Sequence, residues 1–142
     1  MTVKQLSVFI ENRQGRLGEV LKVLKENGVS ILSFSLSDTT EYGILRIIVN
    51  DPVRGCDVLV REGFSSMLTD VLIIKLPHVA GALQSILERI AEKKVNIEYA
   101  YGLTVGTDDA SIVVKANDLD AACDVFKHEQ IKTMSAAEIA SL

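Results

Sequence analysis

The fold of this chain is decided by a stretch of sequence that occurs twice. Residues 14–31 read QGRLGEVLKVLKENGVSI and residues 80–97 read AGALQSILERIAEKKVNI, an offset of 66 positions. The residues identical at this offset are Gly15, Leu17, Leu21, Glu26, Val29 and Ile31, matched by Gly81, Leu83, Leu87, Glu92, Val95 and Ile97. A second block, Asn50-Asp51 with Cys56-Asp57-Val58, recurs 67 positions later as Asn117-Asp118 with Cys123-Asp124-Val125. Two matching blocks in the same order indicate a duplication, so we divide the chain into two modules, residues 1–69 and 70–142.

Hydrophobic periodicity predicts the same first four elements in each module. Apolar residues alternate over residues 6–10 and again over 72–76, which is typical of a strand with one buried face. Helical spacing follows over residues 17–24 and 83–90, and Gly28 is suited to end the first of these helices. Two strands come next, at residues 29–37 and 43–50 in the first module and at 95–104 and 110–116 in the second.

A second helix and a last strand complete each module. Pro52 opens a helix whose apolar face is expected to carry Cys56, Leu59 and Val60, and residues 119–126 repeat it. Short strands are expected at residues 64–68 and 131–134, with a short helix at 135–142. Because strand–helix–strand crossovers are right-handed, both helices of a module lie on one face of its sheet. Each module is therefore predicted to be a ferredoxin-like βαββαβ sandwich.

The predicted fold class is α+β, with the two ferredoxin-like modules side by side. They would share an eight-stranded antiparallel sheet with the helices on one face. A module of about 70 residues is near the lower limit for an independent core, so pairing is expected to protect the sheet edges. The face opposite the helices would carry mixed side chains that a homodimer could partly bury. These are Phe9, Arg46, Ile48, Ile73, Val113 and Lys115.

Composition and charge exclude several classes of function. The chain has 142 residues, a net charge of -4 and a pI near 5.2, so it lacks the basic footprint of a nucleic-acid or anionic-membrane binder. No apolar stretch approaches the roughly 20 residues of a membrane span. The N-terminus does not read as a secretion signal, and we expect a cytoplasmic protein. Two cysteines are too few for a disulfide framework or a zinc site, and we expect neither a metal nor a cofactor.

The segments that join the first two strands of each module resemble the ACT domain. The first is Asn12-Arg13-Gln14-Gly15-Arg16-Leu17, followed after a helix by Val29-Ser30-Ile31. The second is His78-Val79-Ala80-Gly81-Ala82-Leu83, followed by Val95-Asn96-Ile97. The resemblance implies allosteric binding of small ligands, usually amino acids, in a protein that regulates an enzyme of amino-acid metabolism. No catalytic domain accompanies the two modules, which look like a free-standing tandem pair.

The resemblance also implies that a ligand binds where the first loop of one module approaches the second strand of its neighbour. A ligand carboxylate prefers backbone N–H groups at a helix N-terminus. Gly15 has no Cβ to block that approach, and the Asn12 side chain can accept a hydrogen bond from a ligand ammonium. The candidate ligand-binding residues are Asn12, Arg13, Gln14, Gly15, Arg16, Leu17, Ser33, Ser35, His78, Val79, Ala80, Gly81, Leu83, Tyr99 and Tyr101.

Several of these candidates also have purely structural interpretations. Asn12 fits a turn or a helix cap, the two arginines fit solvated surface charges, and the tyrosines fit sheet packing. His78 stands where the family usually has Asp or Asn, while Gln14 and Ala80 stand where it commonly has proline. If only one loop binds, the first is favoured because it keeps its Asn. The tyrosines favour an aromatic, histidine-like or branched ligand, whereas the serines suit small amino acids equally well.

We therefore hypothesise a regulatory protein, not an enzyme, that senses an amino acid or related small metabolite and modulates a partner enzyme. We expect a homodimer that binds neither nucleic acid nor membranes. Arg13-Gln14-Gly15 weakly resembles the phosphate loop of acylphosphatases but lacks the rest of it. The alternative that stays open is a ligand-free oligomerisation or docking module for a metabolic enzyme.

Overall fold

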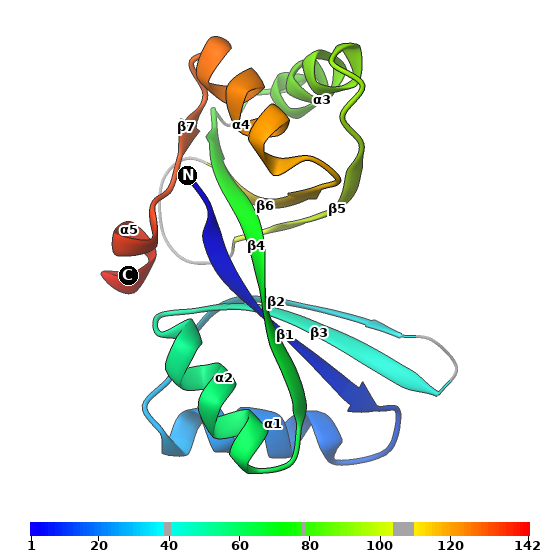
Figure 1. Cartoon of the computed structure of the whole chain (residues 1–142), viewed down its shortest axis with the longest axis vertical. Helices are drawn as coiled ribbons and strands as arrows, with labels where there is room; N and C mark the ends of the chain where they lie inside the picture. Colours follow the sequence, from blue (N-terminus) through cyan, green and yellow to red (C-terminus); the bar gives the residue numbers. More distant parts are fainter. Residues whose placement is uncertain (39–40, 78, 104–109) are drawn as a thin grey trace. The chain divides into compact units, whose positions relative to one another are not determined.

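The structure is a computed structural model and describes residues 1–38, 41–77, 79–103 and 110–142 (Figure 1). The first elements are β1 (Val3–Glu11), α1 (Arg16–Glu26), β2 (Ile31–Asp38) and β3 (Tyr42–Val49). Next come α2 (Pro52–Arg61), β4 (Ser65–Leu76), α3 (Ala82–Glu92) and β5 (Ile97–Gly102). The last are β6 (Ala110–Ala116), α4 (Leu119–His128), β7 (Lys132–Thr133) and α5 (Ala136–Ala140). Thr104, which we expected to end a strand, lies outside the described residues.

The described chain divides into two compact units. The first unit comprises residues 4–69 and 139–142, and the second comprises residues 1–3 and 70–138. The strand order is β2-β3-β1-β4 in the first unit and β7-β4-β6-β5 in the second. The strand pairs whose register is known are all antiparallel. Each unit therefore has the α+β, ferredoxin-like arrangement that the sequence predicted.

The predicted count of eight strands is wrong. The described residues form seven strands, because β4 runs without interruption through the segments 64–68 and 72–76 that we expected to be separate strands. The residues between these segments are extended as well. The Thr69 hydroxyl lies 3.0 Å from the Ser7 hydroxyl of β1, which links this middle part of β4 to the neighbouring strand. β4 is thus both the last strand of the first βαββαβ pattern and the first strand of the second.

Both helices of each unit pack on the same face of its sheet, as Figure 1 shows for each unit by itself. The core of the first unit joins strand residues such as Leu6 and Ile47 to Leu24 of α1 and Leu59 of α2. The core of the second unit has the equivalent composition. It includes Leu72, Ile74, Val114, Ile86, Ile90 and Phe126. Val20 and Leu24 of the first predicted stripe, and Ile86 and Ile90 of the second, therefore face the sheets. Leu21 and Leu87, which we expected on the same stripes, are exposed instead.

The sheet face opposite the helices is less open than we expected. Ile48, Ile73 and Val113 are each 0% exposed within a single chain, whereas Phe9 is 45% exposed. Three of the six residues assigned to a mixed homodimer surface are therefore buried without a second chain. Only the exposed part of that face remains accessible to a partner.

A β-bulge recurs at the start of the second strand of each unit. The register of β2 against β3 shifts between Ile31 and Ser33, and the register of β5 against β6 shifts between Ile97 and Tyr99. Ile31 and Ile97 therefore pack against the helix-side cores, while Ser33 and Tyr99 lie on the other face. Strict alternation would put Ile97 on the same face as Tyr99 and Tyr101, and the bulge is the reason that it lies on the helix side instead.

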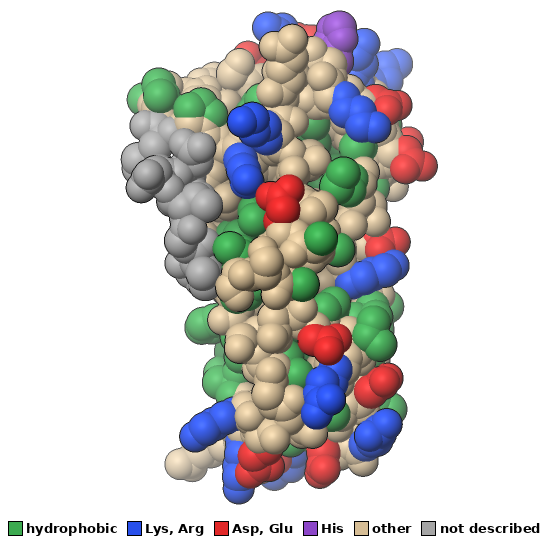
Figure 2. Space-filling view, turned by 90° about the vertical axis from the view of Figure 1, so that its left-hand side faces the viewer, with side chains coloured by type: hydrophobic (Ala, Val, Ile, Leu, Met, Phe, Trp, Pro, Cys, Tyr) green, Lys and Arg blue, Asp and Glu red, His purple; other side chains and the backbone are tan. Residues whose placement is uncertain are grey.

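The surface carries charges of both signs. On the face that Figure 2 shows, Lys and Arg side chains are interspersed with Asp and Glu side chains. One ion pair of the described chain is Lys75–Glu138, at 3.3 Å. None of the described helices has the length and apolar character needed to cross a membrane.

The duplicated Asn-Asp pair holds the start of the second helix in each unit. Asp51 Oδ1 accepts a hydrogen bond from the backbone N–H of Arg54 at 3.2 Å, and Asp118 Oδ1 accepts one from Ala121 at 3.0 Å. Asn50 Oδ1 accepts from the N–H of Ser30 at 2.8 Å, and Asn117 Oδ1 repeats this with Asn96 at 2.9 Å. This part of the repeat is therefore structural.

Removing these caps is expected to destabilise each unit by a similar amount. Asp51→Ala and Asp118→Ala should each lower the free energy of unfolding by about 1 kcal/mol, because an N–H of the first helical turn loses its acceptor. Urea denaturation of the variants measures the change. Asp57→Ala, an exposed position on α2 that caps nothing, is the control. Equal effects at Asp51 and Asp57 would contradict the capping role.

Candidate functional site

The two candidate loops have the same backbone conformation. Gly15 precedes α1 with φ 86° and ψ -13°, and Gly81 precedes α3 with φ 84° and ψ -5°. The same pair of hydrogen bonds closes both loops. In the first, Arg13 N–H donates to Glu11 O at 2.8 Å and Arg16 N–H to Arg13 O at 3.4 Å. In the second, Val79 N–H donates to Pro77 O at 2.8 Å and Ala82 N–H to Val79 O at 3.2 Å.

Both loops leave the following helix open at its N-terminus. The cap residues are Gly15 and Gly81, and neither helix receives a hydrogen bond from a capping side chain. The helices α2 and α4 differ, since aspartates cap them. The N–H groups of a first helical turn have no partner inside the helix, and together they form the positive end of its dipole. Among these four helices of the described chain, α1 and α3 therefore present these groups without a capping side chain, and α2 and α4 do not.

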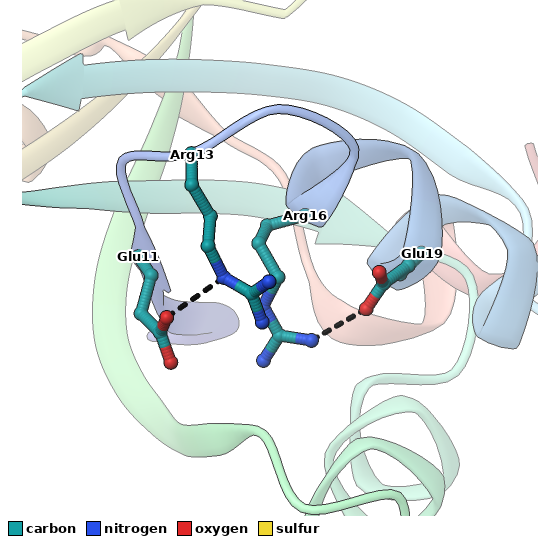
Figure 3. A network of polar contacts seen from close by, with 4 residues as sticks. All are labelled: Glu11, Arg13, Arg16 and Glu19. Atoms are coloured by element: carbon teal, nitrogen blue, oxygen red, sulfur yellow. Dashed lines mark hydrogen bonds and ion pairs between the residues drawn. The ribbon is translucent and has the colours of Figure 1, made fainter.

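The arginines of the first loop are already paired with acidic side chains (Figure 3). Arg13 Nε lies 2.8 Å from Glu11 Oε2, and both side chains are exposed. Arg16 forms an ion pair with Glu19, and its Cζ lies 4.4 Å from the centroid of the Phe64 ring. The buried Arg16 Nε has no hydrogen-bond partner among the described residues. Arg16 thus packs against the core of its own unit, and this placement favours its structural role over ligand contact.

Asn12 does not cap α1, because Gly15 occupies the cap position. Its backbone N–H donates to Glu41 O at 3.0 Å, while its side chain is exposed. Gln14 is exposed beside it. The side chain of Asn12 is thus available at the loop, as the sequence-based hypothesis requires. His78, at the equivalent place in the second loop, lies outside the described residues.

A small hollow lies at the first loop. Its volume is about 90 Å³, and loop residues Asn12, Arg13 and Leu17 line it together with Leu36 and Asp38 of β2. Leu36 reaches into this region, since its Cδ1 lies only 3.3 Å from the place where a Cβ on Gly43 would stand. The first hollow is therefore small and carries charged side chains.

A larger hollow lies at the second loop. Its volume is about 310 Å³. The residues that line it are Leu76, Pro77, Val79, Ala80, Ala82, Leu83, Ala110 and Ile112. Gly102 pairs with Ile112 as Leu36 pairs with Leu45, so Gly102 holds the place that Leu36 takes in the first unit. The second unit thus has a glycine where the first has a leucine, opposite Ile112 of the second hollow.

The structure does not bring all the predicted site residues together within a unit. Val79, Ala80 and Leu83 line the second hollow with Ala110 and Ile112, which sequence reasoning missed. Ser33 and Ser35 pair with Ile48 and Arg46, on the sheet face away from the helices. Tyr99 and Tyr101 hold the equivalent places opposite Lys115 and Val113. Within its own unit, each second strand therefore turns the predicted serines or tyrosines away from the helix side.

The cysteines are not part of the loop sites. Cys56 and Cys123 are free and occupy equivalent positions on α2 and α4. Burial, and secondarily the neighbouring Asp57 carboxylate, raises the pKa of the Cys56 thiol, which favours its unreactive protonated form. Among the described residues, no cluster of three or more His, Cys, Asp or Glu side chains could hold a metal ion.

One further hollow, of about 630 Å³, lies between α3 and α4. Acidic and basic side chains line it, among them Asp124 and His128. Arg89, which also lines it, pairs with Glu129 at 3.5 Å. None of the loop residues predicted to bind a ligand takes part in this hollow, so it is separate from the candidate site.

Comparisons with known proteins agree with this geometry. The family model described as an ACT domain pair matches residues 1–142. Protein BT0572 from Bacteroides thetaiotaomicron has a crystal structure that is 33% identical, with a TM-score of 0.92, over 100% of this chain and 98% of that one. No curated protein matches the sequence.

Two regulatory subunits of aspartate kinase share the fold at low sequence identity. The ligand-free form from Thermus thermophilus is 16% identical, with a TM-score of 0.64, over 89% of this chain and 93% of that one. The subunit from Thermus flavus is 16% identical, with a TM-score of 0.61, over 88% of this chain and 90% of that one. The repeated loop, the two βαββαβ units and the match over the whole sequence lead to one conclusion. The chain belongs to the family of ACT domain pairs.

Proposed function

We propose that this chain is a regulatory protein that binds a free amino acid, or a closely related metabolite, and thereby modulates a partner enzyme. The observation that carries the proposal is a loop that occurs once in each unit with the same backbone conformation. In both loops a glycine with a left-handed backbone precedes a helix that has no capping side chain, and a hollow lies beside it. Membership of the ACT domain pair family and the common fold with two regulatory subunits of aspartate kinase support it. A cytoplasmic location and a homodimer remain predictions.

The chemistry of the first loop suits both ends of an amino acid. The uncapped N–H groups of α1 would receive the carboxylate. The Asn12 side-chain oxygen and the Asp38 carboxylate, which line the same hollow, would accept hydrogen bonds from the ammonium. Glu11 is less suited to this role because it is paired with Arg13.

A thermal-shift screen of the free amino acids tests the proposal. A ligand at about one hundred times its dissociation constant should stabilise the protein by roughly 2.7 kcal/mol. We expect at least one amino acid to do so, and Asn12→Ala to weaken binding if the first loop takes part. Lys22→Ala, on the solvent side of α1, is the control. No shift with any amino acid or related metabolite would contradict the proposal.

One observation favours the alternative, a ligand-free docking or oligomerisation module. Strand β2 ends the strand order of the first unit and exposes 60% of Phe34 and 47% of Leu36. An edge strand with exposed apolar side chains is suited to pairing with another strand. If this alternative is correct, Phe34→Lys should change the oligomeric state in sedimentation experiments, and amino acids should leave the melting temperature unchanged.

A further inference from the structure

We infer that the second unit binds an aliphatic ligand side chain in the hollow beside α3, and that the first unit does not accept such a side chain at its equivalent place. This inference rests on the proposed function and specifies its ligand class. It assigns different specificities to two loops whose backbones are alike.

The described side chains that line the second hollow are all apolar. Leu76, Leu83 and Ile112 supply branched side chains, and the remaining described residues are valine, alanine and proline. Among the described residues, no side chain that lines this hollow could hydrogen-bond to a charged or amide ligand side chain, so moving such a group from water into this part of the hollow is unfavourable. An aliphatic side chain loses nothing by leaving water and gains contacts. The chemistry of the lining therefore selects a ligand such as leucine, isoleucine or valine.

The exposure of the lining residues points the same way. Val79 is 67% exposed and Leu83 is 39% exposed, although both are large apolar residues. They meet at one hollow next to an open helix N-terminus. Exposed apolar side chains that converge on a concave site are typical of ligand-binding positions. An aliphatic ligand would cover part of both side chains.

The first unit supplies an internal comparison. Its hollow measures about 90 Å³ against about 310 Å³ in the second unit, and ligand pockets usually begin near 300 Å³. Leu36 fills the place that Gly102 leaves empty. Charged Arg13 lines the first hollow where Val79 lines the second. The smaller volume and the charged lining therefore make the first hollow less suited to a branched aliphatic side chain.

Refilling the second hollow tests the inference. Gly102→Leu reproduces the side chain of the first unit, and a Cβ at Gly102 meets no atom within 4 Å. We expect isothermal titration to show at least tenfold weaker binding of leucine to this variant. Ala100→Leu, which adds the same bulk two residues earlier on the same face of β5, should bind leucine as the unmodified protein does.

Methyl NMR of the unmodified protein gives a measurement that does not depend on the variant folding. Leucine should shift the methyl signals of Leu83 and Ile112 and leave those of Leu17 unchanged. Binding of serine or aspartate without leucine would overturn this inference and leave the proposed function in place. Leucine binding that Gly102→Leu does not weaken, or that shifts only Leu17, would also overturn it. No binding of any amino acid would overturn both.

Discussion

Replacing Phe126 by alanine is expected to destabilise the second unit by about 3–5 kcal/mol. Phe126 lies on α4, is 0% exposed and packs in the core with Leu72 and Ile90. The substitution removes an aromatic ring and leaves a cavity that the neighbouring side chains fill only in part. Because a native protein is stable by only about 5–15 kcal/mol, this loss is a large part of the total. Urea denaturation followed by circular dichroism measures it.

The exposed Phe34 provides a matched control, since it undergoes the same chemical change at 60% exposure. Phe34→Ala should change the free energy of unfolding by no more than about 0.5 kcal/mol. Amide exchange locates the effect, because protection should fall in β6 and α4 more than in α1 and α2. If Phe34→Ala and Phe126→Ala lower the free energy of unfolding by similar amounts, the core of the second unit is assigned incorrectly.

Most of the fold could be predicted from the sequence, because the pattern that marks each helix or strand occurs in both modules. Helical spacing placed α1 and α3, and Pro52 marked the start of α2. Two features of the strands escaped prediction. Alternation cannot reveal the bulge before Ser33 and Tyr99, since an extra residue in a strand leaves no compositional mark. The continuity of β4 also escaped prediction, because this strand lies beside β1 and β6 and such long-range pairing is not visible in the local sequence.

The candidate site was predictable in its backbone and less so in its side chains. Gly15 and Gly81 stood out at matching positions, and both adopt the left-handed conformation. The difference between Leu36 and Gly102 was visible at the same offset, but its meaning depends on knowing that both face the helix side. The role of Arg16 could not be predicted, because its partner Phe64 is distant in sequence.

Replacing both loop glycines by alanine should have the second largest effect. Gly15 and Gly81 have φ values of 86° and 84°, a region in which an L-residue is destabilised by roughly 1–2 kcal/mol. No atom lies within 4 Å of an added Cβ at either position, so the loss comes from the backbone and not from a clash. Since the glycines belong to different units, their effects should add to about 2–4 kcal/mol in the double variant.

Gly18 gives the matched control, because it also has no atom within 4 Å of an added Cβ but lies inside α1 with an ordinary helical backbone. Gly18→Ala should stabilise the protein by up to about 1 kcal/mol, as alanine favours the helix. Urea denaturation should show that the free energy of unfolding falls in Gly15→Ala and rises in Gly18→Ala. If Gly15→Ala also stabilises the protein, the loop does not require the left-handed conformation. The shared backbone would then carry no argument for a shared ligand site.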